Sequence, residues 1–311
     1  MRRSGRVLQF LLLAAAEQYA EGMIARSNIA LSTGLTMEWL SCRKQISVSS
    51  LSPPPVLFVH GTFHGAWCYE AHWMEHFAAA GIDCHAISLR GTSGSPSDQK
   101  SVKISEHVAD LQSFIRQVFC ESGRPPILVG HSFGGASVLK YLEAGGIASA
   151  AALVCAVPPS GNGPMTLRFV QRDFWQAWAI LRGFAFKTAT RSVAEARALF
   201  FDESSSEADV ARYMPRLKAD SKVGLNLADF SRNLPIGAAG TDGHAAWHDA
   251  SSVPTLVLGA ARDYVVDREG VLEMATFLDC EAEFVDLPHD VMLCKGWQIA
   301  ADRIIDWVRT V

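Results

Sequence analysis

Short apolar runs alternate along the chain with stretches of helical periodicity. From residue 101 to 121, for example, apolar side chains recur every three or four residues, which is typical of one buried helix face. Strands are predicted at residues 56–60, 82–89, 127–130, 151–157, 255–259 and 283–287, and helices at 67–80, 101–121, 133–143, 269–278 and 297–308. Apolar strands separated by helices predict an α/β fold with a mostly parallel, doubly wound sheet.

The first 52 residues do not follow this rhythm. They open with Arg2, Arg3 and Arg6, continue with an apolar stretch at 7–16, are rich in serine, and hold only three acidic residues. A secretory signal, an organellar transit peptide and an ordinary N-terminal helix all fit this pattern. We expect residues 1–52 to be a leader outside the core, and favour a plastid or mitochondrial transit peptide over a secreted or cytoplasmic protein. The triple proline at 53–55 marks its predicted end.

The composition argues against several classes of protein. The chain of 311 residues has 28 Lys and Arg against 32 Asp and Glu, so no basic excess favours binding to nucleic acid. Its seven cysteines form no CxxC pair, which argues against a disulfide scaffold or zinc finger. No apolar run reaches the ~20 residues of a transmembrane helix. Nothing in the composition indicates the oligomeric state.

The motif Gly130-His131-Ser132-Phe133-Gly134 lies between a predicted strand and a predicted helix. In this context G-x-S-x-G predicts a sharp turn that raises a serine hydroxyl above the sheet edge, close to the helix N-terminus. A glycine-rich helix start capped by Ser132 is the structural alternative. We predict that Ser132 is a nucleophile.

A second motif, at residues 60–65, follows the first predicted core strand and reads HGTFHG. Acyl transfer needs two backbone N–H groups directed at the developing oxyanion. The amides of Thr62 and Phe133 are the candidates, because one follows the His-Gly turn and the other follows the nucleophile. His60 is expected to brace this loop by hydrogen bonding rather than to move protons.

These motifs resemble the α/β-hydrolase superfamily of serine esterases and lipases. The stretch VHGTFHGAW is similar to the opening of plant methylesterases and hydroxynitrile lyases, and LRGTSGSP resembles the family's loop after the next strand. The resemblance implies a Ser, Asp, His order along the chain. It points to Asp263, with Asp267 and Asp249 as competitors, and to His289 as the base. Serine at the elbow argues against the haloalkane dehalogenases and epoxide hydrolases of the superfamily, which use a carboxylate nucleophile.

The resemblance also implies a helical cap at residues 160–251, inserted before the acid-bearing strand, with the core at 53–159 and 252–311. Aromatic residues crowd one part of this segment, where they could line an apolar substrate pocket or pack the cap onto the core. They are Phe169, Phe174, Trp175, Trp178, Phe184 and Phe186. We expect substrate contacts from Trp175 and Trp178 in the cap, and from His131 and Phe63 in the core.

The expected function is cleavage of a small carboxylic ester with an apolar acyl or alcohol part, with no cofactor and no metal. Two alternatives stay open. One is a lyase or cofactor-free enzyme on the same fold, for which Lys295 would supply a cation. The other is a receptor that keeps the pocket for a small ligand without turnover.

Overall fold

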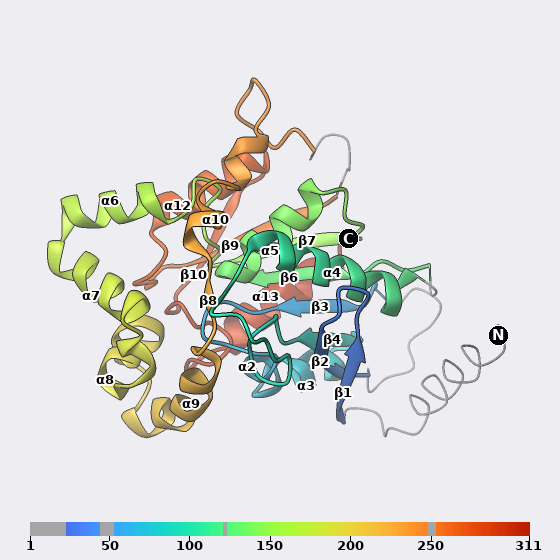
Figure 1. Ribbon diagram of the computed structural model, residues 1–311, viewed down its shortest axis with the longest axis horizontal. Coiled ribbons are helices and arrows are strands. Elements are labelled where there is room, and N and C mark those ends of the chain that lie inside the picture. The colour runs from blue at the N-terminus through green and yellow to red at the C-terminus, as the bar shows by residue number, and fades with distance from the viewer. Residues whose placement is uncertain (1–22, 44–52, 121–122, 248–252) are drawn as a thin grey trace.

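An eight-stranded sheet forms the centre of the computed structural model, which describes residues 23–43, 53–120, 123–247 and 253–311 (Figure 1). The strand order is β1-β2-β4-β3-β6-β7-β9-β10; β1 and β2 run antiparallel, β2 and β4 also, and the remaining pairs are parallel. The strands are β1 (Ile24–Ala30), β2 (Thr36–Cys42), β3 (Val56–Val59), β4 (Cys84–Ile87), β6 (Ile127–His131), β7 (Ala150–Val154), β9 (Thr255–Ala260) and β10 (Ala282–Val285). The predicted α/β architecture is confirmed, and each predicted strand overlaps one of these.

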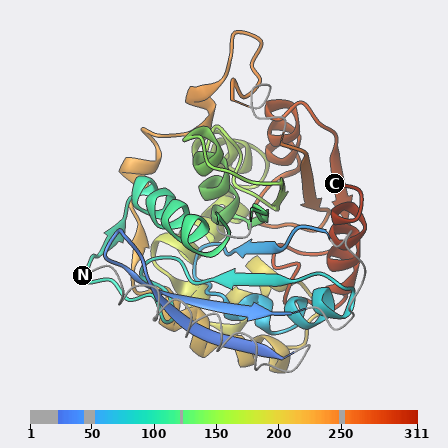
Figure 2. The ribbon, with the colours of Figure 1, turned by 90° about the vertical axis from the view of Figure 1, so that its right-hand side faces the viewer.

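Helices flank the sheet, as Figure 2 shows. Among the described residues, α4 packs against α5, and α3 packs against α13. The core helices are α2 (Trp67–Glu70), α3 (Trp73–Ala79), α4 (Ile104–Val118), α5 (Phe133–Glu143), α12 (Arg268–Phe277) and α13 (Gln298–Val308). The helix predicted at 67–80 is therefore two, because the backbone of His72 leaves the helical region with φ −151°.

The prediction that all of residues 1–52 lie outside the core is wrong. Residues 24–42 form the hairpin β1–β2, with Gly34 at φ +84° in its turn, and β2 joins the sheet through β4. Met37 and Leu40 are fully buried there. The hairpin was missed because neither strand is a continuous apolar run like the parallel core strands: IARSNIA and TMEWLSC both interrupt their apolar residues with polar or charged ones. The rest of the predicted leader, residues 1–22 and 44–52, lies outside the described residues.

The segment after β7 adds further helices. They are α6 (Asn162–Arg172), α7 (Phe174–Ala185), η2 (Thr188–Thr190), α8 (Val193–Ala196), the π-helix η3 (Arg197–Phe201), α9 (Glu207–Asp220), α10 (Leu227–Phe230) and η4 (Pro235–Ala238). Of these, α6 to α9 are gathered at the left of Figure 1, beyond the ends of the central strands, whereas α10 lies nearer the middle of the view. A two-residue strand, β8 (Gly224–Leu225), pairs with β5 (Ser101–Val102) before α4. The segment also joins the core through Arg168, whose guanidinium pairs with Asp267. The exact division at residues 160 and 251 stays a prediction.

Within the described ranges, none of the helices combines the length and the apolar character needed to cross a membrane.

Candidate active site

Ser132 occupies the turn that joins β6 to α5. Its backbone lies at φ +54° and ψ −121°, a strained conformation for a residue with a side chain. Hydrogen bonds hold it there, since its amide donates to the Val154 carbonyl at 3.0 Å, and its own carbonyl accepts from the amides of Gly135 and Val157. The neighbouring strand and the new helix together fix the direction of the hydroxyl.

Close backbone approach explains the glycines of this turn. A Cβ on Gly134 would lie 2.2 Å from the Val59 carbonyl oxygen, and a Cβ on Gly130 would lie 2.7 Å from the Cα of Gly135. Real side chains do not tolerate such distances from backbone atoms. Both positions therefore require glycine, as a nucleophile elbow demands.

The predicted base and the predicted acid come to Ser132 from the ends of two further strands. His289, which follows β10, places Nε2 3.2 Å from Ser132 Oγ and Nδ1 2.8 Å from Asp263 Oδ2. Asp263 follows β9, and its other oxygen accepts the amides of Val265 and Val266 at 2.7 and 2.9 Å. The side chains of His289 and Asp263 are almost completely buried. The three predicted residues thus form one continuous Ser-His-Asp chain of hydrogen bonds.

Neither of the two competing acids, Asp267 and Asp249, is seen to bind His289 among the described residues. Asp267 caps the N-terminus of α12 by accepting the Gly270 amide, and its carboxylate binds Arg168 through two hydrogen bonds. It therefore serves the fold rather than the histidine. Asp249 lies outside the described residues.

The pKa of His289 is raised above that of a free histidine. Burial alone would lower this pKa, but the charge and hydrogen bond of Asp263 outweigh burial, and Asp290 acts in the same direction. The neighbouring His131 responds oppositely: burial and the positive charge of His289 lower its pKa to about 3, so it is neutral. A base of raised pKa takes up a hydroxyl proton more readily.

The predicted oxyanion donors lie on either side of Ser132. Phe133 is the first residue of α5, and Thr62 lies on the loop after β3, where a Cβ added to Gly61 would lie 2.8 Å from Ser132 Cβ. In the described part of the chain, neither the Thr62 nor the Phe133 amide donates to a protein oxygen. Both are therefore available to a substrate oxygen.

Of the predicted substrate contacts, Phe63 lies at an aromatic wall. Its ring stacks on Phe184 of α7 at 5.4 Å, and Phe184 meets Phe200 of η3 at 5.8 Å. Phe200 in turn lies 6.3 Å from the His289 ring. We call Phe63, Phe184 and Phe200 the aromatic wall. Phe200 was missed in the sequence because a pair of phenylalanines in a short π-helix has no distinguishing pattern.

The placement of the two tryptophans argues against their predicted role. Trp175 is 74% exposed and Trp178 is 43% exposed, whereas Phe184 of the same helix is packed against the core. Phe174 and Phe186 are also exposed, whereas Phe169 is buried. His131 is buried behind the triad, with Nε2 donating to the carbonyl of His289 at 3.0 Å, so it supports the base rather than lining a pocket.

Comparison with known proteins agrees with this geometry. The model described as the Alpha/beta hydrolase family matches residues 56–296. The chain belongs to the alpha/beta hydrolase family. Methylesterase 10 of Arabidopsis thaliana is 32% identical over 91 residues, which are 28% of this chain and 31% of the relative. The pFDCC methylesterase MES16 of the same plant is 38% identical over 91 residues, 28% of this chain and 32% of that one.

The matched part of this alpha/beta hydrolase thus spans between 31% and 48% of the length of the curated relatives it matches. A solved esterase of Thermogutta terrifontis superposes with a TM-score of 0.63 at 18% identity, covering 92% of this chain and 98% of the esterase. That likeness shows the fold, and the shorter matches give no substrate for this chain.

Lys295, which the lyase alternative would need in the active site of this alpha/beta hydrolase, has an exposed side chain. One trio of possible metal ligands comes together among the described residues, with atoms of His131, Cys155 and His289 within 4.8 Å of one another. His289 already binds Asp263 and Ser132, and burial raises the pKa of Cys155 well above that of a free thiol, which disfavours the thiolate. A role in supporting His289 therefore suits these residues better than metal binding.

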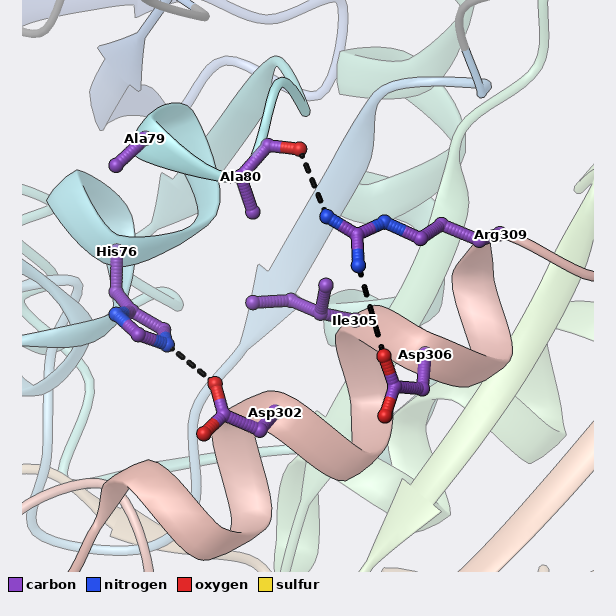
Figure 3. Close-up of a pocket in the computed structure, with 7 residues that line it drawn as sticks. All are labelled: His76, Ala79, Ala80, Asp302, Ile305, Asp306 and Arg309. Atoms are coloured by element: carbon purple, nitrogen blue, oxygen red, sulfur yellow. Dashed lines mark hydrogen bonds and ion pairs between the residues drawn. The ribbon is translucent and has the colours of Figure 1, made fainter.

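A hollow on the surface of this alpha/beta hydrolase lies away from these residues. The hollow lies between α3 and α13 (Figure 3) and has a volume of about 470 Å³. His76, whose Nε2 forms a hydrogen bond with Asp302 Oδ1 at 2.6 Å, borders it, as does Arg309, which binds Asp306 and the Ala80 carbonyl. It holds no nucleophile and no member of the triad. Ser132, by contrast, is buried, with 6% of its surface exposed.

Proposed function

We propose that this chain is a serine hydrolase that cleaves carboxylic esters with an apolar part through an acyl-enzyme. The single observation that carries the proposal is the hydrogen-bonded chain Ser132–His289–Asp263 at a strained strand-to-helix turn. The similarity to proteins named methylesterases supports an ester as the substrate. Serine at the elbow favours acyl transfer over chemistry that needs a carboxylate nucleophile.

In this mechanism His289 Nε2 takes the Ser132 proton while Oγ attacks the ester carbonyl carbon. The amides of Thr62 and Phe133 donate to the carbonyl oxygen as it becomes negative, an effect of about 2.7–4 kcal/mol for each such donor. The imidazolium then gives its proton to the leaving alcohol, and the acyl group stays on Ser132. Water, deprotonated by His289, releases the acid in the second half of the cycle.

Asp263 holds Nδ1 of His289 in its protonated tautomer and stabilises the imidazolium. Its second oxygen is anchored by two backbone amides, so the carboxylate has one fixed orientation. The aromatic wall of Phe63, Phe184 and Phe200 supplies apolar surface beside the reacting serine, which favours an apolar acyl or alcohol group.

Hydrolysis of p-nitrophenyl esters from acetate to palmitate, with methyl esters of aromatic and aliphatic acids alongside, tests the proposal. Wild type is expected to turn over at least one series, and Ser132→Ala is expected to lose that activity. Cleavage of a cyanohydrin without ester hydrolysis would favour the lyase alternative. Equal activity in wild type and Ser132→Ala would reject the assignment of the nucleophile.

A further inference from the structure

The loop that carries the Thr62 amide is tied to the loop of the catalytic histidine by a second buried His–Asp pair. His64 lies two residues after Thr62, and Asp290 directly follows His289. We propose that His64 is a permanently protonated positioning residue, which Asp290 anchors and which holds the oxyanion loop in its working geometry. The proposal rests on the proposed function, because it assigns a role within the same site.

The hydrogen bonds of His64 determine its protonation. Nδ1 lies 2.8 Å from the Thr62 carbonyl oxygen, and Nε2 lies 3.0 Å from Asp290 Oδ2. A carbonyl oxygen and a carboxylate oxygen are both acceptors, so both ring nitrogens must carry a proton. His64 is therefore an imidazolium facing a carboxylate.

Both side chains of this pair are buried, so each charge depends on the other. The side chains of His64 and Asp290 are 2% and 0% exposed, so neither charge is tolerated without the other. Burial alone lowers the pKa of His64, but Asp290 and then Thr62 and Asp220 outweigh burial and the net shift is upward. For Asp290, burial raises the pKa, while His64 first, then His131 and His289, bring it below that of a free aspartate.

The other histidine of the loop, His60, is neutral. His60 Nδ1 donates to the Gly61 carbonyl at 2.8 Å, and its Nε2 accepts from the Leu89 amide at 2.9 Å. That pattern needs one proton, and burial lowers the pKa of His60 to about 3. His60 thus holds the Gly61 carbonyl and His64 holds the Thr62 carbonyl.

These two carbonyls belong to the peptide units on either side of the Thr62 residue. The N–H of Thr62 shares a rigid plane with the Gly61 carbonyl, so the two histidines together determine where that N–H points. The contacts around His64 keep its ring in place: it stacks on Trp67 at 5.4 Å, and Phe200 lies edge-on at 6.2 Å. Since an oxyanion donor acts through its direction, loosening this clamp weakens stabilisation of the transition state rather than binding of the ester.

A matched pair of double variants isolates the clamp. Replacing His64 alone would leave the Asp290 carboxylate buried and unpaired, so both variants also carry Asp290→Asn. His64→Phe/Asp290→Asn keeps a ring on Trp67 but donates nothing to Thr62. His64→Asn/Asp290→Asn retains an amide N–H near the position of Nδ1. The two proteins differ in one side chain only.

For the phenylalanine variant we expect kcat to fall about 10- to 100-fold, less than loss of a whole oxyanion donor, with KM changed less than about twofold. Affinity for a trifluoromethyl ketone, which forms a tetrahedral adduct, should fall in parallel. The asparagine variant should recover most of kcat. Equal kcat in both variants, or a change in KM alone, would overturn the positioning role.

NMR of the histidines in the wild-type protein tests the charge of His64 and needs no variant. With 15N-labelled histidine, both His64 nitrogens should show protonated shifts up to pH 8, and a neutral ring at pH 7 would contradict the proposal. Because this measurement needs no turnover, it separates failure of the clamp from failure of the esterase assignment. If the wild type cleaves no ester, the proposed function fails while the charge of His64 is still decided.

Discussion

Asp263 Oδ2 and His289 Nδ1 lie 2.8 Å apart although 26 residues separate them in the chain. The contact exists because β9 and β10 are parallel neighbours, so the loops that follow them leave the same edge of the sheet. The same edge carries the turn after β6, where Ser132 lies. Sheet order therefore assembles the triad, and each of its members can be tested separately.

Asp263→Asn is expected to reduce kcat by about 10⁴-fold, because an amide cannot hold the His289 tautomer or stabilise its cation. Asp267→Asn is the matched control, four residues away on the same loop. It should leave kcat within a few-fold of wild type while weakening the ion pair with Arg168. Esterase kinetics on the two variants decide the assignment, and the reverse order of effects would transfer the role to Asp267.

The pH profile of kcat/KM should rise through the pKa of His289, since only the neutral ring accepts the serine proton. Asp290 raises this pKa and the His64 cation lowers it, Asp290 being the larger influence. Asp290→Asn removes the carboxylate and, with it, the proton on His64. The net change follows the larger contribution, so the acidic limb should move to lower pH. A limb that stays in place or moves to higher pH would contradict this.

The aromatic wall should limit the size of the acyl group. Phe184→Ala removes the ring stacked on Phe63, so the ratio of kcat/KM for octanoate over acetate should rise severalfold. Trp178→Ala, which replaces an exposed side chain of the same helix, should leave the ratio unchanged. A chain-length profile that responds to Trp178 and not to Phe184 would restore the original assignment of the tryptophan.

The hairpin β1–β2 should contribute to global stability. Leu40 is fully buried, so Leu40→Ala should lower the free energy of unfolding in urea by about 2–5 kcal/mol. Thr36→Ala, at the exposed start of β2, should change it by less than about 0.5 kcal/mol. If Leu40→Ala unfolds like wild type, residues 24–42 behave as a dispensable leader after all.

The elbow could be predicted from local sequence, because Gly130 and Gly134 mark a close backbone approach. Asp263 and His289 could be predicted because each follows a recognisable strand in the Ser, Asp, His order that the family resemblance implies. The side of α7 that faces the site could not be predicted from the sequence. Phe184 and Trp178 are both large apolar residues, and periodicity does not say which face of the helix is covered. The pairing of His64 with Asp290, 226 residues apart, depends on how two loops meet and leaves no pattern in the sequence.

The central claim is that Ser132 is the nucleophile, and covalent labelling tests it most directly. The protein is treated with diethyl p-nitrophenyl phosphate, and the product is examined by intact mass and by peptide mapping. One diethylphosphoryl group per chain, located on Ser132 and absent from Ser132→Ala, is the expected result. Labelling of another residue, or equal labelling of wild type and Ser132→Ala, would contradict the account.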